Sequence, residues 1–303
     1  MFETIKGLFK NKATSWKFSD NTSKQLTPIR HSANKFTNEK DIYFDPKDYS
    51  MFKFGCKDVA RRFGIELAQS FMNSDEYKKI KTESLFIHPE KRIIVISSPY
   101  VHIPTATFAM KDYFIRYLNH NLVHSNLMPV LEAKMYRKSS YKEEYGEMNK
   151  EQRFAIMEKD VFHIDKSLIQ GNICLFLDDI VITGAHEHRV KKMLEQYNIQ
   201  SENYFLYFAE LSSHETNPII ENYLNYAFVK NLVCLDKIIK NENFLMNTRV
   251  VKYILDAPFE ECKTFLTYQK QVFLQTLYHN AIGNGYHLID DYSMNLGYLK
   301  SII

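Results

Sequence analysis

The sequence predicts an α/β fold with a doubly wound, mostly parallel sheet, an N-terminal arm and a helical C-terminal region. Apolar, β-branched runs such as RIIVIS and NICLFL alternate with helical patterns in the middle of the chain, as they do in βαβ units. From His214 onward, long helical segments follow one another and no strand pattern is convincing. We therefore expect an arm or hood segment over residues 1–42, an α/β domain over residues 43–211 and a helical region over residues 212–303.

The first ninety residues predict an arm, a helix and a connector. Residues 13–40 are polar and show little periodicity, which favours an extended arm or loop. Residues 57–72 carry apolar side chains at helical spacing and predict a helix. Residues 74–90 are rich in charge and are typical of a connector.

The sheet is predicted from three strong strands and one weaker strand. The apolar run over residues 93–96 predicts a strand that is buried on both faces, and Pro99 ends it. A helix is expected in TATFAMKDYFIRYLNHNL, a weaker strand in LMPVLEAKM, a second buried strand in NICLFL, a helix after it and a third strand in NYFLYFAEL.

Composition and charge are those of an ordinary globular protein. The 303 residues are 45% apolar and 25% charged, with a net charge of +3. This slight basic excess fits a phosphate-bearing ligand without requiring nucleic acid. The four cysteines are scattered and form no CxxC pair, which argues against a disulfide framework or zinc knuckle and favours a reducing cytoplasm. No apolar run approaches the roughly 20 residues of a membrane span.

The stretch ICLFLDDIVITGAHE predicts a ligand site at the end of a buried strand. Asp178 and Asp179 end the apolar run, and open parallel sheets bind ligands beyond the carboxyl ends of their strands. The turn that follows enters a helix, whose first N–H groups form an anion site. Gly184 allows close approach of a phosphate, and Thr183 adds a hydroxyl donor. A ribose 5-phosphate fits this description, whereas the simpler alternative is a helix capped by one of the acids.

The same stretch resembles the signature of type I phosphoribosyltransferases, which bind 5-phosphoribosyl-1-pyrophosphate (PRPP). The shared pattern is four apolar residues, two acids and a short apolar/Thr/Gly turn. FKFGCKDVARRFGIELAQSF and VISSPY are similar to stretches of the ComF-like branch of this family. The resemblance covers roughly residues 43–211, and it implies the type I phosphoribosyltransferase fold.

The resemblance also implies roles for individual residues. Asp178 and Asp179 would bind the ribose hydroxyls and, through PRPP, Mg²⁺. The 5-phosphate would be bound by Ile180, Val181, Ile182, Thr183, Gly184, Ala185 and His186. The pyrophosphate loop would contain Ser98, Pro99, Tyr100 and His102. A lid over RKSSYKEEYGEMN would supply the catalytic candidates Tyr141, Lys138 and Lys142, whose lysines would neutralise the departing diphosphate. Mg²⁺ would be held mainly by ligand oxygens and water.

Three positions depart from the pattern of many relatives. Ile182 and His186 stand where hydroxyl side chains are usual, so two donors to the phosphate are replaced. The pyrophosphate loop lacks its usual basic residue and has only His102. These differences favour binding of PRPP over efficient turnover.

Two other motifs carry open alternatives. His186 and His188 in HEH could be a metal pair, but residues two apart at a helix start point to different faces. IGNGYH has no strand before it, which favours a helix C-cap followed by a turn. The alternative is that the tail folds back and brings Tyr286 or His287 over the site.

Two functional hypotheses follow. The first is a magnesium-dependent phosphoribosyltransferase that transfers ribose 5-phosphate from PRPP to an unidentified base or amine. The second is a non-catalytic PRPP or nucleotide sensor, or an accessory protein of a nucleic-acid process, because ComF-like proteins are linked to DNA uptake. A homodimer is left open, and a nucleic-acid partner has little support in the residues.

Overall fold

The computed structural model describes residues 29–83, 87–138, 161–213 and 217–303. The helices and strands are, in chain order, β1 (Ile29–Phe36), α1 (Pro46–Lys53), α2 (Lys57–Met72), α3 (Asp75–Thr82), β2 (Ile93–Ser97), α4 (Ala106–His124), β3 (Leu131–Ala133), β4 (Tyr136–Arg137), β5 (Phe162–His163), α6 (Lys166–Ile169), β6 (Ile173–Val181), α7 (Ala185–Gln196), β7 (Glu202–Leu211), α8 (Ile220–Asn225), α9 (Leu232–Ile239), α10 (Thr248–Leu255), α11 (Phe259–Thr267), α12 (Gln271–Gly283) and α13 (Ser293–Ser301).

The main sheet has five strands in the order β1-β7-β6-β2-β3. Each neighbouring pair in this sheet is parallel, so the predicted parallel α/β fold is confirmed. The register places Ser97 of β2 beside Leu177 of β6, and Asp178 beside Tyr207 of β7. The carboxyl ends of the central strands therefore meet at one edge, and the acid pair lies there. A short antiparallel pair, β4 and β5, stands apart from this sheet.

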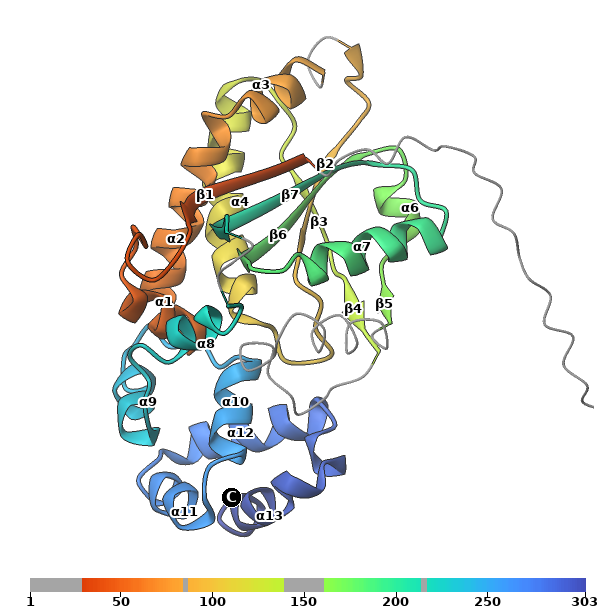
Figure 1. Cartoon of the computed structure of the whole chain (residues 1–303). Helices are drawn as coiled ribbons and strands as arrows, with labels where there is room; N and C mark the ends of the chain where they lie inside the picture. Colours follow the sequence, from red (N-terminus) through yellow and green to blue (C-terminus); the bar gives the residue numbers. More distant parts are fainter. Residues whose placement is uncertain (1–28, 84–86, 139–160, 214–216) are drawn as a thin grey trace, which may run out of the picture.

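Helices cover both faces of the sheet. Figure 1 shows α2 and α4 on one side of the strands and α7 on the other. On the first face, the rings of Phe63 and Phe208 stack with centroids 3.8 Å apart. On the second face, the rings of Phe176 and Phe205 stack with centroids 5.3 Å apart. The two apolar layers explain why the central strands read as continuous apolar runs.

Two elements of the first ninety residues differ from the prediction. Ile29–Phe36, expected in an arm or loop, forms β1 and pairs with β7 at the edge of the sheet. Its polar side chains have partners outside the strand, since Asn34 bonds Glu66 and Ser32 bonds Glu210. In the expected connector, residues 75–82 form α3, whose first turn is capped by the side chain of Ser74. The expected helix over residues 57–72 is confirmed.

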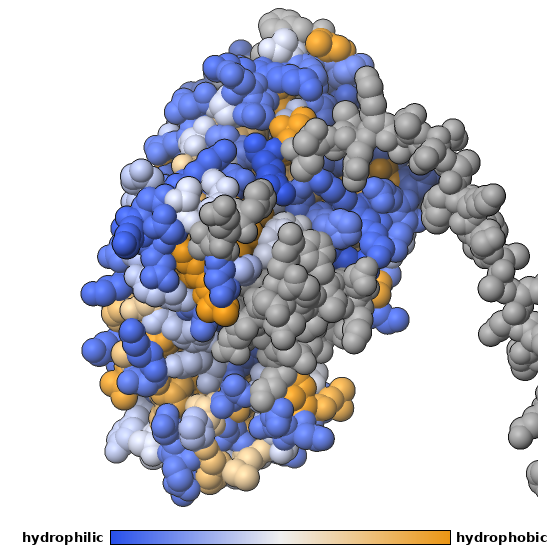
Figure 2. Space-filling model, in the orientation of Figure 1, coloured by the Kyte–Doolittle hydropathy of each residue, from blue (hydrophilic) through white to orange (hydrophobic). Residues whose placement is uncertain are grey.

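The helical C-terminal region lies at the end of the molecule toward which the central strands run, as Figure 1 shows for α8 to α13. In Figure 2, hydrophilic side chains cover most of the visible α/β face, and several hydrophobic patches lie over the helical region. Exposed apolar residues in that region include Val272 at 74% and Tyr268 at 78%. None of the helices among the described residues is long and apolar enough to cross a membrane.

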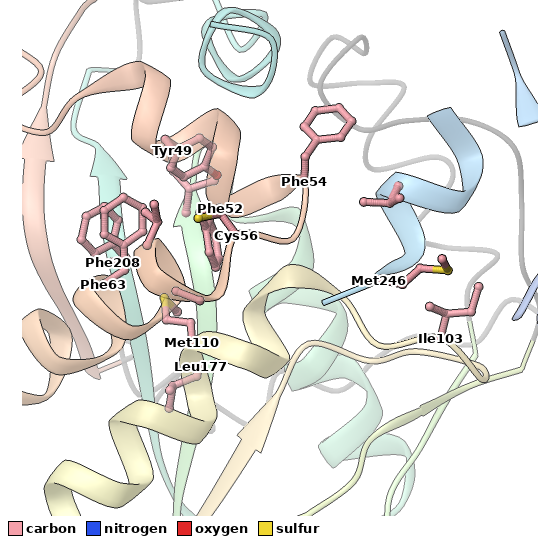
Figure 3. Close-up of a cluster of buried hydrophobic side chains, with 14 of the residues drawn as sticks. Tyr49, Phe52, Phe54, Cys56, Phe63, Ile103, Met110, Leu177, Phe208 and Met246 are labelled. Atoms are coloured by element: carbon pink, nitrogen blue, oxygen red, sulfur yellow. The ribbon is translucent and has the colours of Figure 1, made fainter. Parts of the chain in front are cut away.

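The helical region is joined to the α/β part by backbone contacts and by the core. Leu245 N–H donates to the carbonyl of Gly55 at 2.9 Å. Gly55 has φ +92°, and a Cβ there would lie 2.3 Å from the Leu245 carbonyl oxygen, so only glycine fits this approach. Ile103, in the loop after β2, and Met246, just before α10, are both buried in one apolar cluster, and Figure 3 draws them close together.

Candidate active site

A pocket of about 210 Å³ lies at the carboxyl ends of β6 and β2. Its lining residues come from the turn after β6, the loop after β2, the end of α1, the start of α4, β4 and the helical region. Every residue of the turn from Ile180 to His186 is among them, together with Asp178, Asp179, Ser98 and Pro99. The fold thus brings the predicted ribose and phosphate residues, and two of the four predicted pyrophosphate residues, to one cavity.

Asp178 is surrounded by donors from three elements. Its Oδ1 accepts hydrogen bonds from the Ser98 hydroxyl at 2.7 Å, the Asp179 N–H at 3.0 Å and the Thr107 hydroxyl at 3.2 Å. Its Oδ2 lies 2.8 Å from Nδ1 of His186. Burial alone would raise the pKa of Asp178, but the charge and hydrogen bond of His186 outweigh it and hold this pKa below the ordinary value. Asp178 is therefore an ionised acceptor.

Asp179 has different partners because it lies on the other face of the strand. Its Oδ2 accepts a hydrogen bond from the Tyr49 hydroxyl at 2.6 Å and forms an ion pair with Lys53. Both of these partners come from α1, and the Thr107 hydroxyl of α4 donates to Oδ1 at 3.4 Å. Burial and the neighbouring charge of Asp178 raise the pKa of Asp179, although Lys53 opposes them. The acid pair thus contains two carboxyl groups with opposite pKa shifts.

The phosphate turn has the backbone that the sequence predicts. Gly184 has φ +74° and precedes α7, so its left-handed conformation favours glycine. A Cβ at this position would lie 3.2 Å from Nη2 of Arg30. The same arginine holds the buried Glu187 through Nε at 2.5 Å, and Lys191 holds it from the other side at 2.9 Å. Two cations therefore brace the first turn of α7 from outside the cavity.

The predicted pyrophosphate loop is only partly in the pocket. Ser98 and Pro99 line it, whereas Tyr100 and His102 are not among the lining residues. The ring of His102 packs beneath α12, because a Cβ on Gly283 would lie 2.4 Å from its Cδ2. The N–H groups of His102 and Ile103 both donate to Oδ1 of Asn284, at 3.0 and 2.9 Å. His102, the basic residue available in this loop, thus contacts the helical region and not the pocket.

The other candidates fall into two groups. Some are described by the structure but do not line the pocket, and the others lie outside the described residues. Lys138 is exposed and does not line the pocket. Tyr141 and Lys142 lie outside the described residues. His188 is exposed, and no group of three or more His, Cys, Asp or Glu side chains suited to a metal occurs in the described ranges. Tyr286 is fully buried against Tyr292 and does not line the pocket.

Sequence reasoning missed several polar residues of the pocket. They are Lys53, Thr105, Thr107, Tyr207, Glu221, Thr248, Arg249 and Lys252, whereas Arg137, which also lines the pocket, is the first residue of the predicted lid segment RKSSYKEEYGEMN. A signal existed for Lys53, which belongs to the FKFG stretch that carried the resemblance. No motif marks Arg249 and Lys252, which are three residues apart on a helix far along the chain.

The comparisons with known proteins agree with this geometry. A family model described as PRTase ComF-like matches residues 28–299. No curated protein matches the chain. Among solved structures, a crystal structure of adenine phosphoribosyltransferase is 16% identical over 52% of this chain and 74% of that chain, with a TM-score of 0.24. That structural similarity is too low to support a statement about function.

Proposed function

The chain belongs to the ComF-like phosphoribosyltransferase family, and from this membership we propose that it transfers ribose 5-phosphate from PRPP to a base or amine and releases pyrophosphate. One observation supports the proposal more than any other. Asp178, Asp179 and the complete turn from Ile180 to His186 line a single pocket at the carboxyl edge of the sheet. This edge is where parallel sheets bind their ligands.

Each part of PRPP has complementary groups in the pocket. The 5-phosphate would lie at the start of α7, where backbone N–H groups and the helix dipole favour an anion. The ribose hydroxyls would donate to Asp178 and Asp179. Lys53 and His186 are paired with these acids, so they would have to give way partly, or become phosphate partners, when ribose binds.

Mg²⁺ fits the chemistry of this site as a partner of the ligand. The donors are two adjacent carboxylates, of which Asp178 is ionised, and Mg²⁺ prefers such hard oxygens together with phosphate and water. Asp178 and Asp179 would contact the ion directly or through the ribose. When bound, Mg²⁺ would neutralise part of the diphosphate charge.

The reaction would be a displacement at the anomeric carbon of ribose. The lone pair of an acceptor nitrogen would form the new bond to this carbon as its bond to the diphosphate oxygen breaks, and the bonding electrons would leave with pyrophosphate. The transition state would resemble an oxocarbenium ion. The chain's contribution would be positioning of ribose by Asp178 and Asp179 and stabilisation of the leaving charge by pocket cations.

A binding measurement and an activity measurement together test this function. Calorimetry with PRPP and Mg²⁺ should show binding by the parent and its loss in Asp178→Asn plus Asp179→Asn. Release of pyrophosphate should then be found with at least one member of a broad panel of bases and amines. Absence of PRPP binding by the parent would overturn the proposal.

A PRPP sensor is the second candidate, and the intrachain pairing of the acids favours it. Asp179 already pairs with Lys53 and Asp178 with the imidazole of His186, and Ile182 and His186 replace hydroxyl donors in the turn. A protein with these features could bind PRPP and release it unchanged. PRPP binding that depends on Asp178 and Asp179, without turnover across the panel, would support the sensor. A strongly salt-dependent affinity for single-stranded nucleic acid would instead favour an accessory role in a nucleic-acid process.

A further inference from the structure

We propose that Arg249 and Lys252 of the helical C-terminal region bind the diphosphate of PRPP, in place of the basic residue that the loop after β2 lacks. This inference rests on the proposed function, because it assigns residues to the same ligand. The helical region would then be part of the ligand site and not merely a support for the sheet.

The loop after β2 needs a cation from elsewhere. Residues 98–105 contain one ionisable base, His102, and its ring packs beneath Gly283 of α12. Ser98, which does line the pocket, donates its hydroxyl to Asp178. A diphosphate carries several negative charges, and its binding in proteins relies on Arg and Lys.

The start of α10 is fastened to this loop. Thr248 donates through its backbone N–H to the carbonyl of Pro104 at 3.0 Å, and through its hydroxyl to the carbonyl of Ile103 at 2.9 Å. Ile103 and Met246 are both buried in the same apolar cluster, and Figure 3 draws both side chains. The first turn of α10 is therefore hydrogen-bonded to this loop.

The same turn is also hydrogen-bonded to α1, the helix whose Tyr49 and Lys53 bind Asp179. The side-chain amide of Asn247, which is 2% exposed, donates to the carbonyl oxygen of Lys53 at 3.0 Å. Its Oδ1 accepts from Val250 N–H and so caps α10. Lys53 in turn pairs with Asp179. The start of α10 thus bridges the loop after β2 and the residues around the ribose acids.

Arg249 and Lys252 enter the pocket from this bridge. Both line the cavity that contains Asp178, Asp179 and Ser98. The guanidinium of Arg249 lies 6.0 Å from the ring centroid of the buried Phe54, which restricts its position. Lys252 is only 8% exposed. These two cations lie on the pocket side that is fastened to the pyrophosphate loop, which makes the diphosphate their natural partner.

The electrostatics around Tyr49 agree with this position. Burial and the charges of Asp179 and Glu221 raise the pKa of Tyr49 well above its ordinary value, and the charge of Arg249 acts against them. Arg249 is therefore close enough to influence the hydroxyl that binds Asp179. A guanidinium at this place can approach a diphosphate attached to ribose on the acid pair.

The test compares PRPP with two smaller ligands, pyrophosphate and ribose 5-phosphate, each of which corresponds to one part of PRPP. Calorimetry with Mg²⁺ would measure the affinities of PRPP, pyrophosphate and ribose 5-phosphate for the parent, Lys252→Met and Arg249→Met. Lys300→Met, which removes an exposed lysine of α13, serves as the matched control. We expect PRPP and pyrophosphate to bind roughly ten- to hundredfold more weakly to each variant, as for loss of a charged hydrogen bond. Ribose 5-phosphate should bind within about twofold of the parent.

Two further variants strengthen the comparison. Arg249→Lys and Lys252→Arg keep the charge and should retain most of the PRPP affinity. If a methionine variant does not fold, as judged by thermal melting, Arg249→Gln or Lys252→Gln replaces it, with the same expected loss. Glu221→Gln removes a carboxylate that lines the same pocket and should increase the affinity for pyrophosphate.

The possible results separate this inference from the function on which it rests. Unchanged PRPP and pyrophosphate affinities in the Arg249 and Lys252 variants would overturn the inference. If the parent still binds PRPP, the proposed function would stand. Equal losses for ribose 5-phosphate and pyrophosphate would also overturn it, since they would indicate a general structural defect. A parent that binds neither PRPP nor pyrophosphate would overturn both.

Discussion

The hydroxyl of Tyr49 lies 2.6 Å from Oδ2 of Asp179, which ties α1 to the acid pair of the central strand. Tyr49→Phe should therefore weaken both folding and ligand binding. Loss of a hydrogen bond to a carboxylate costs about 1.5–3 kcal/mol of unfolding free energy. We also expect weaker PRPP binding, because Asp179 would lose one of the three side chains that donate to it, the others being Lys53 and Thr107. Urea denaturation and calorimetry measure the two effects.

Tyr77→Phe is the matched control for this variant. Tyr77 is a buried tyrosine of α3, 6% exposed, and it does not line the pocket. The Tyr77→Phe variant should therefore bind PRPP with the affinity of the parent. Equal PRPP affinities in Tyr49→Phe and Tyr77→Phe would show that the bond to Asp179 has no part in binding.

The phosphate turn can be tested with two glycines of the same conformation. Gly184 has φ +74° and lies in the turn, whereas Gly171 has φ +76° and a Cβ added there would meet no atom within 4 Å. Alanine at either site should cost about 1 kcal/mol of stability from left-handed strain. Only Gly184→Ala should weaken the binding of ribose 5-phosphate, measured by calorimetry. A similar loss in Gly171→Ala would trace the effect to strain and not to the phosphate site.

Asn284 should prove essential for the loop after β2. Its Oδ1 accepts the N–H groups of His102 and Ile103, so Asn284→Ala leaves two donors without their acceptor. We expect a loss of roughly 1–3 kcal/mol in unfolding free energy and weaker pyrophosphate binding. Asn284→Asp keeps an acceptor oxygen and should bind pyrophosphate better than the alanine variant. The reverse order of affinities would contradict this role.

Stability should fall in alkaline solution because of two buried thiols. Burial raises the pKa of Cys174 and of Cys262 from 9.0 to about 12. Between these values the folded chain keeps the thiol protons while the unfolded chain releases them. The unfolded state then binds fewer protons, so the unfolding free energy decreases as pH rises above about 9, by up to about 1.4 kcal/mol per pH unit for each thiol.

Urea midpoints between about pH 8 and about pH 10.5 measure this decrease. Cys174→Val should reduce the slope, because it removes one of the two groups. An unchanged slope in Cys174→Val and in the corresponding Cys262 variant would exclude the thiols as its cause.

The central strands could be predicted from the sequence because a strand buried on both faces leaves a clear pattern in it. Residues 93–97 and 173–177 are buried on both faces, and a strand of that kind reads as an unbroken apolar run. The edge strand could not be predicted in the same way. Ile29–Phe36 has only one fully buried residue, and its polar side chains find partners, such as Glu66 and Glu210, that are distant in sequence.

The acid pair and the turn after it could also be predicted from the sequence, because they form one continuous segment. Most of the cations of the pocket could not be predicted, since Lys53 lies on α1 and both Arg249 and Lys252 lie on α10, far from the acid pair in the sequence. Lys53 is 126 residues from Asp179, its partner, and Arg249 reaches the cavity through the packing of α10 against the loop that contains Pro104. Spacing within a sequence carries no information about contacts of this kind, which tertiary packing creates.

The bond from Asn284 to the backbone of His102 joins residues 182 positions apart. During translation, at roughly 5–20 residues per second, this distance corresponds to a delay of roughly 10–40 s. For that interval the nascent loop exists without its acceptor, while the strands beside it have already left the ribosome. The sheet can form early, but the loop after β2 gains its acceptor only after α12 has been synthesised.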